Sequence, residues 1–292
     1  MNKQYATHSA ILGLMRSYDI QPKKGLGQNF LTDPRVAEKI IAAAQITSND
    51  YVIEIGAGLG GLTQVLANNA KAVLAIELDK RLAAIAQDLF AQMSHVEILQ
   101  SDILKADIGK LMKERGWQTA KIAANLPYYI ATQVIMDLLE GSSSISMITV
   151  MVQREVAERL TAKPGSKEYG TLSLAAAYYA DVTLSANVPR NCFFPRPNVD
   201  SAVVTLRLRE VGSDPLIKGM LFKCIKAAFG NRRKTLVNCL RAQDWVQKDR
   251  QELIEIVKGC GFDENIRGEA LSLDEFTHLA HKLRHSGITS FP

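Results

Sequence analysis

The sequence predicts an α/β protein, in which a mainly parallel sheet has helices on both faces and a small C-terminal α-helical domain follows. Short, nearly continuous apolar segments alternate with segments of helical character up to about residue 211, which is typical of a parallel sheet buried on both faces. A turn signal at Gly212-Ser213-Asp214-Pro215 then gives way to a purely helical pattern. We therefore predict two domains, residues 1–211 and 212–292.

The N-terminal part of the chain predicts an arm, a loop and a helix. Residues 1–20 have the character of a short helix or arm, and the loop at 23–31 is basic and punctuated by glycine. Asp33 precedes Pro34, an N-cap followed by proline at the first helical position, so a helix is expected over 34–44. The loop is either a linker or a segment that closes over a bound cofactor and contacts phosphates.

Residues 52–67 predict a strand, a tight turn and a helix in succession. The turn matches the pattern G-x-G-x-x-G through Gly56, Gly58 and Gly61. Glycine can adopt positive φ, which lets backbone N–H groups and the helix N-terminus approach a ligand. Glu77 lies 21 residues after Gly56, where a carboxylate binds ribose in dinucleotide enzymes. The match is ambiguous, because S-adenosylmethionine (SAM) also contains a ribose and an adenine.

The remaining elements continue the alternation. Further strands are expected at residues 72–77, 96–99, 121–125 and 146–152, with a helix over 80–92. Two later strands, at 181–188 and 202–208, have no helix between them and could pair as an antiparallel edge. The C-terminal domain is expected to contain helices at 216–229, 234–240, 252–258 and 273–282.

Three polar residues lie at or just after the ends of predicted strands, namely Glu77, Asp102 and Asn125. Ligands of doubly wound sheets bind beyond the carboxyl ends of the strands. Glu77 could accept both ribose hydroxyls, while Asp102 could accept from the exocyclic amine of an adenine. A dinucleotide enzyme does not require this second carboxylate. Each acid alone is equally well an exposed charge, but the set favours a nucleoside ligand such as SAM.

The segment Asn125-Leu126-Pro127-Tyr128 predicts chemistry on an adenine amine. The N6 lone pair is delocalised into the ring, so the amine is a poor nucleophile. The side-chain oxygen of Asn125 and the carbonyl of Leu126 or Pro127 could accept both amine hydrogens and pull the nitrogen toward tetrahedral geometry. Tyr128 offers a face on which an extruded base can stack. A sulfonium is already a good leaving group, so in-line positioning supplies most of the effect without a general base. The alternative is an ordinary Pro-Tyr turn with Asn125 as a cap.

Composition limits the class of protein. There is no run of about 18 apolar residues that would span a membrane. The first 20 residues lack the features of a secretion signal and contain few bases for a transit peptide. The cysteines have no C-x-x-C spacing or nearby histidine pattern, which indicates reduced thiols in a cytoplasmic protein and no metal site. They are Cys192, Cys224, Cys239 and Cys260.

The charge distribution favours a nucleic-acid partner. The net charge is only +5, but residues 218–241 contain seven bases and no acid. Such an acid-free basic stretch is typical of a surface that contacts a phosphate backbone. The alternative is a solvated helix face.

Taken together, these motifs resemble the ribosomal RNA adenine dimethyltransferase family over nearly the whole chain. The matching segments are residues 27–31, 54–60, Glu77, Asp102, residues 125–128, 193–201 and 229–236. The resemblance implies the Rossmann-like fold of class I SAM-dependent methyltransferases. It is closest to the members that dimethylate N6 of two adjacent adenosines near the 3′ end of 16S rRNA, with a role in biogenesis of the small (30S) subunit. It further implies a 16S rRNA substrate in a 30S precursor and, we expect, a monomeric enzyme.

The resemblance also assigns roles to residues. It implies contacts to SAM from Asn29, Leu31, Gly56, Gly58, Glu77, Asp102 and Asn125. The target adenine would be held by Asn125, Leu126, Pro127 and Tyr128, with Phe193 stacking on its other face. RNA contacts are expected from Lys23, Lys24, Arg232, Arg233 and Lys234. The chain departs from many members at Tyr129, where they have Asn, and from sequence alone Phe193 is as readily a core aromatic.

Three other functions stay open at this point. A relative that methylates large-subunit RNA and confers macrolide resistance has the same catalytic motifs. An RNA-binding assembly factor would use the same surface with methylation incidental. A dehydrogenase is supported only by the glycines and Glu77.

Overall fold

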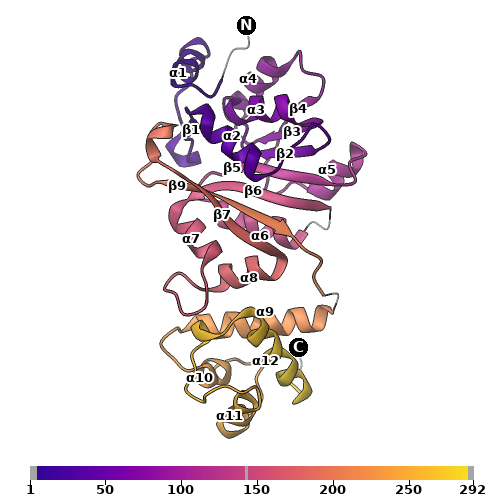
Figure 1. The fold of residues 1–292 in the computed structure, drawn as a ribbon, viewed down its shortest axis with the longest axis vertical. Coiled ribbons are helices and arrows are strands. Elements are labelled where there is room, and N and C mark those ends of the chain that lie inside the picture. The colour runs from indigo at the N-terminus through magenta and orange to yellow at the C-terminus, as the bar shows by residue number, and fades with distance from the viewer. Residues whose placement is uncertain (1–4, 142–143, 213, 289–292) are drawn as a thin grey trace. The chain divides into compact units, whose positions relative to one another are not determined.

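A computed structural model describes residues 5–141, 144–212 and 214–288 (Figure 1). The chain divides into two compact units. The first contains the residues up to Ala157 together with Ala180–Arg209, and the second contains Glu158–Tyr179 together with the residues from Glu210 onward. The second unit therefore includes residues 158–179, which the sequence pattern places in the first domain.

The first unit is built on a seven-stranded sheet of strand order β4-β3-β2-β5-β6-β9-β7. Figure 1 labels these strands. In that order the strands are Val96–Gln100, Ala72–Glu77, Tyr51–Ile55, Ala120–Asn125, Ile145–Gln153, Ser201–Leu208 and Ala180–Val188. The first five are parallel, while β9 pairs antiparallel with β6 and β7 antiparallel with β9. The predicted α/β class and the antiparallel pair are confirmed.

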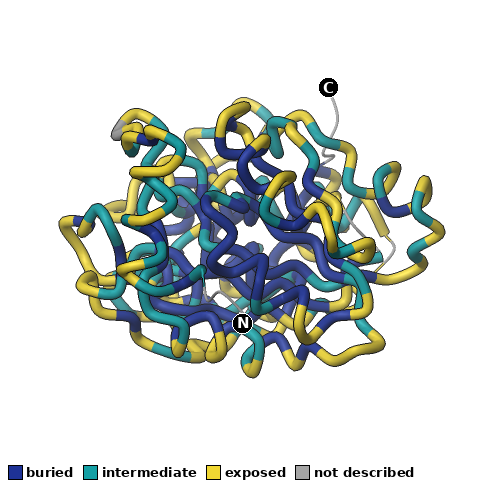
Figure 2. Tube along the Cα trace, turned by 90° about the horizontal axis from the view of Figure 1, so that it is seen from above, coloured by how far each residue is buried: buried dark blue, intermediate teal, exposed yellow. Residues whose placement is uncertain are grey.

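Both faces of the sheet are buried, which explains why its strands are almost continuously apolar. Val52 and Val73 belong to one buried cluster that includes residues of three helices, while their neighbours Ile53 and Leu74 are fully buried on the opposite face. The helices are α2 (Pro34–Ala43), α3 (Gly61–Asn69) and α4 (Lys80–Phe90), and α5 (Ile108–Glu114) and α6 (Ala131–Gly141) follow later in the chain. Figure 2 marks the buried segments in dark blue.

The N-terminal segment packs on the first unit. It contains α1 (His8–Ser17), a 3₁₀ turn (Lys24–Leu26) and the short strand β1 (Phe30–Leu31), which pairs antiparallel with β8 (Phe193–Phe194). Ile11 of α1 and Phe30 share a buried cluster with Leu59 of the glycine turn and with residues of α4. The segment is therefore part of the fold and not a linker.

The second unit is helical. It contains the second half of α7 (Arg154–Thr161), then α8 (Thr171–Tyr179), α9 (Pro215–Gly230), α10 (Leu236–Arg241), α11 (Arg250–Gly259) and α12 (Leu273–His285). Tyr169 and Leu174 are buried in the same apolar cluster as Met220, Leu240 and Phe276. Because α8 is apolar almost all round, its periodicity does not indicate which core it joins.

Within the described ranges, no helix has the length and apolar character that crossing a bilayer requires. The same residues contain no cluster of three or more His, Cys, Asp or Glu side chains that could hold a metal ion.

Candidate functional site

A cavity lies at the carboxyl edge of the parallel strands. Its walls come from the N-terminal segment, the glycine turn and the residues that follow β3, β4 and β5. It brings together ten residues that sequence reasoning assigned to cofactor or base binding: Asn29, Leu31, Gly56, Gly58, Glu77, Asp102, Asn125, Leu126, Pro127 and Tyr128. The parallel topology explains this gathering, since strand ends meet at one edge of the sheet.

The glycine turn and Glu77 form one side of the cavity. Gly56, Gly58 and Gly60 have φ values of 84°, 56° and 80°, in the left-handed region that favours glycine. Glu77 Oε2 accepts a hydrogen bond from the Gly58 N–H at 2.9 Å, and its Oε1 accepts one from the Asp79 N–H at 2.8 Å. Each carboxylate oxygen keeps a further lone pair for a ligand hydroxyl. The turn and the carboxylate thus hold each other in place.

Burial raises the pKa of Glu77, and the two backbone donors oppose that rise. A second carboxyl, Glu54 of β2, also lines the cavity and is only 1% exposed. Its Oε2 has no hydrogen-bond partner within the described chain. Burial, reinforced by the charge of Glu77, raises the pKa of Glu54 to about 8. Glu54 is therefore mostly protonated near pH 7.

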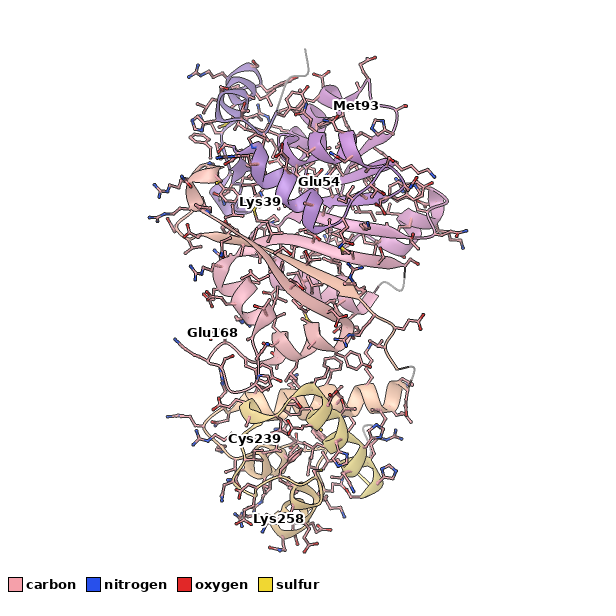
Figure 3. The ribbon with its side chains drawn as sticks, viewed as in Figure 1. Lys39, Glu54, Met93, Glu168, Cys239 and Lys258 are labelled. Atoms are coloured by element: carbon pink, nitrogen blue, oxygen red, sulfur yellow. The ribbon has the colours of Figure 1, made fainter. Side chains whose placement is uncertain are left out.

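Sequence reasoning did not assign a role to Glu54, whose position Figure 3 labels in the first unit. The signal was an acidic residue inside an otherwise apolar strand, because a carboxyl there must be buried.

Asp102 lies beyond the end of β4, with two exposed leucines at the cavity. Its Oδ1 accepts a hydrogen bond from the Leu104 N–H at 3.1 Å. Leu78 and Leu104 line the cavity and are 41% and 43% exposed. Exposed apolar side chains beside a carboxylate suit a flat heterocycle that carries an amine.

Asn125 is oriented by the N-terminal segment. Its Nδ2 donates to the backbone carbonyl of Asn29 at 3.1 Å, and Asn29 Nδ2 in turn donates to the carbonyl of Gly27 at 3.0 Å. No hydrogen bond to Asn125 Oδ1 is formed within the described chain, so this oxygen is available as an acceptor.

The residues after Asn125 present one free carbonyl. The Leu126 N–H donates to the Met151 carbonyl at 3.1 Å, which ties the loop to β6. The Pro127 carbonyl accepts from the Ile130 N–H at 3.2 Å. Of the two carbonyls considered from the sequence, that of Leu126 is thus the one that makes no hydrogen bond in the described structure.

Tyr128 is half-buried, and its position is fixed through its hydroxyl. The hydroxyl lies 2.7 Å from Ser201 Oγ, and Ser201 is fully buried at the start of β9. Burial raises the pKa of Tyr128, so the phenol stays neutral. Its neighbour Tyr129 also lines the cavity and is 56% exposed.

Phe193 does not line this cavity. It is 3% exposed and packs in the buried cluster that contains Leu31 and Val188. The pairing of β8 with β1 places Phe193 opposite Leu31, so it supports that strand. Phe193 is therefore a core aromatic, as the alternative from the sequence had it. It does not line the cavity, where it would have to lie to stack on an adenine.

The five predicted RNA contacts have different environments. Lys23 Nζ forms an ion pair with Asp79 Oδ2 at 2.7 Å, and the side chain of Lys24 lies outside the described part of the structure. Arg232 forms an ion pair with Glu269, while Arg233 and Lys234 are exposed. The last three belong to the second unit, and none of the four described side chains lines the cavity.

Comparison with known proteins adds independent information. The family described as ribosomal RNA adenine dimethylase matches residues 20–269. The ribosomal RNA small subunit methyltransferase A of Lachnoclostridium phytofermentans is 49% identical, covering 88% of this chain and 90% of the relative. That of Clostridioides difficile is 42% identical, covering 94% and 96%.

Solved structures agree with the fold. A dimethyladenosine transferase from Plasmodium falciparum superposes with a TM-score of 0.76 and is 27% identical, covering 89% of this chain and 99% of that one. The 23S rRNA methyltransferase ErmE superposes with a TM-score of 0.69 at 22% identity, covering 88% and 100%. Because the identity is low, this second comparison supports the fold only.

Proposed function

The chain belongs to the ribosomal RNA adenine dimethylase family, and we propose that it transfers methyl groups from SAM to N6 of two adjacent adenosines near the 3′ end of 16S rRNA. One observation carries this proposal: the residues expected to bind SAM and those expected to hold the adenine amine line a single cavity. The names of its relatives as small-subunit methyltransferases support the choice of RNA. We further propose that the substrate is a small-subunit precursor and that the enzyme acts as a monomer.

The cavity residues fit SAM. SAM supplies an electrophilic methyl group on a sulfonium, which is a good leaving group. Glu77 would bind the ribose hydroxyls with the lone pairs that its backbone donors leave free. Asp102 would accept from the adenine amine, with Leu78 and Leu104 beside the ring. The N-terminal segment would cover the ligand through Asn29 and Leu31.

Activation of the target amine depends on two acceptors. Asn125 Oδ1 and the Leu126 carbonyl are both available in the described structure. By accepting the two N6 hydrogens, they would localise the nitrogen lone pair and direct it at the methyl group. Tyr128, fixed by Ser201, would stack on the base. The first transfer would release one proton from N6 and leave one hydrogen, so the site must then accept a methyl group in place of one hydrogen bond.

A methyl-transfer assay tests this function. Purified protein is incubated with labelled SAM and small subunits from a strain that lacks this methylation, and the RNA is analysed as nucleosides. We expect label in N6,N6-dimethyladenosine of 16S rRNA. Label only in monomethyladenosine, even at long times with excess SAM, would contradict dimethylation. Label in large-subunit RNA would assign the resistance function, and no label in either RNA would favour the assembly factor.

A pair of asparagine variants provides the control. Asn125→Ala is expected to abolish transfer and retain RNA binding. Asn69→Ala removes an exposed asparagine of α3 whose side chain donates to the Val65 carbonyl, and it is expected to leave transfer unchanged. Full rescue of a deletion strain by Asn125→Ala would show that binding, and not methylation, is the cellular role.

A further inference from the structure

Arg232 uses its guanidinium within the protein. Its Nη2 and Nε lie 3.0 and 3.2 Å from Glu269 Oε2, and its Nη1 donates to the Lys167 carbonyl at 2.7 Å. A longer bond of 3.4 Å joins Nη2 to the Ser166 carbonyl. The guanidinium also lies over the ring of Phe229, 5.9 Å from its centroid. A phosphate would have to displace these partners to bind Arg232.

These contacts hold the loop of residues 163–169, which connects α7 to α8. The Gly165 N–H donates to the Glu269 carbonyl at 2.8 Å, so Glu269 holds the loop through both its backbone and its partner Arg232. At the end of the loop, the hydroxyl of buried Tyr169 donates to the Leu271 carbonyl at 2.8 Å. Hydrogen bonds thus hold the loop in place at its middle and at its end.

Two basic side chains of this loop are exposed to solvent. Lys163 and Lys167 are exposed, and neither forms an ion pair with any described residue. The bond from Arg232 to the Lys167 carbonyl places this loop beside the segment that carries Arg233 and Lys234, which are also exposed. The nearby acid Glu269 is neutralised by Arg232, and Glu168 is half-exposed. The two adjacent segments therefore carry four exposed bases that form no ion pair with any described residue.

We propose that Lys163 and Lys167 contact the RNA phosphate backbone together with Arg233 and Lys234, and that Arg232 is a positioning residue that holds their loop. This inference rests on the proposed function, since it specifies how an RNA substrate is held. It replaces the direct RNA contact that the sequence pattern suggested for Arg232. Lysine suits this role because phosphate recognition here requires charge without base readout.

The test measures affinity for small subunits that lack the methylation, as a function of salt. Replacing both Lys163 and Lys167 with alanine is expected to weaken binding about tenfold near 0.1 M salt and to lower the salt slope by about 2, because two phosphate contacts are lost. Lys258→Ala is the control. Lys258 is an exposed base of α11 that Figure 3 shows far from Glu168 within the second unit, and its loss is expected to change neither quantity.

Arg232→Lys then separates positioning from contact. It keeps the charge but removes the fork that reaches a carboxylate and two carbonyls at once. We expect about threefold weaker binding and faster hydrogen exchange of the Gly165 amide. In the variant that already lacks Lys163 and Lys167, the same change is expected to have no further effect on affinity.

Two results would overturn the proposal. Unchanged affinity after loss of both lysines would exclude the loop from the RNA surface. An effect of Arg232→Lys that persists without the lysines, or occurs without faster exchange of Gly165, would make Arg232 a direct contact. Failure of the proposed function is distinguishable, because the unaltered protein would then transfer no methyl group to 16S rRNA.

Discussion

The buried carboxyl of Glu54 makes the stability of the first unit dependent on pH. In the unfolded chain this group ionises around its ordinary pKa of 4.5, whereas in the folded protein its pKa is about 8. Between these values the folded state binds more protons, so the free energy of unfolding falls as pH rises. At about 1.4 kcal/mol per pH unit, the total loss is about 5 kcal/mol. Glu54→Gln keeps the shape of the side chain and removes this titration.

We therefore compare the unfolding free energies of Glu54→Gln and the unaltered protein. Their difference is expected to shift in favour of the variant by about 3 kcal/mol from pH 5.5 to pH 7.5. The assay is urea unfolding followed by fluorescence. The chain has two tryptophans, and Trp117 is in the first unit while Trp245 is in the second. A Trp245→Phe background makes Trp117, stacked on Tyr51 with centroids 4.7 Å apart, the reporter of the first unit.

The control for this prediction is Glu140→Gln, which changes an exposed carboxylate on α6 of the same unit. Its unfolding free energy should follow that of the unaltered protein at every pH. A constant difference between Glu54→Gln and the unaltered protein across this range would refute the reasoning, because it would mean that Glu54 ionises in the folded state as it does in the unfolded state.

Two further substitutions test the geometry of the site. Tyr128→Phe and Ser201→Ala each remove the bond between their hydroxyls, worth about 1 kcal/mol, so each should lower kcat about fivefold with the KM for SAM unchanged. The double variant should be no slower than either single one, and full additivity would show that the bond does not position the ring. Gly60→Ala should cost about 2 to 5 kcal/mol in urea unfolding, because a Cβ there would lie 2.7 Å from the buried ring of Phe90 at a φ of 80°. Gly116→Ala, with a φ of 67° and open space, should cost only about 1 kcal/mol, and equal losses would disprove the clash.

The sequence predicts which strand ends meet around the cavity, because parallel strands align their carboxyl ends. A strand that stops at Glu77 and one that stops at Asn125 meet at the same edge whatever the details of packing. The amphipathic pattern and the Asp33-Pro34 cap likewise define α2, which begins at Pro34 as expected. These features depend on local chemistry, which can be read along the chain.

Other features depend on long-range packing that no local pattern encodes. Phe193 and Leu31 are paired across two short strands, and strands of two residues carry almost no periodic signal. Arg232 forms an ion pair with Glu269, which lies outside the basic stretch of residues 218–241. Counting charges within that stretch therefore overestimates how many of its bases are free to contact RNA. Similarly, the apolar α8 fits either core, and only the contacts of Tyr169 and Leu174 assign it to the second unit.

The pairing of β1 with β8 has a consequence for the nascent chain. Asn29 and Leu31, which form one wall of the cavity, leave the ribosome early, but the partner strand at Phe193–Phe194 emerges roughly 160 residues later. At about 5 to 20 residues per second, translation of that interval takes on the order of 10 s. During this time the parallel strands can associate while β1 still lacks its hydrogen-bonding partner. This wall of the cavity is therefore completed late in translation, when nearly all of the first unit has been synthesised.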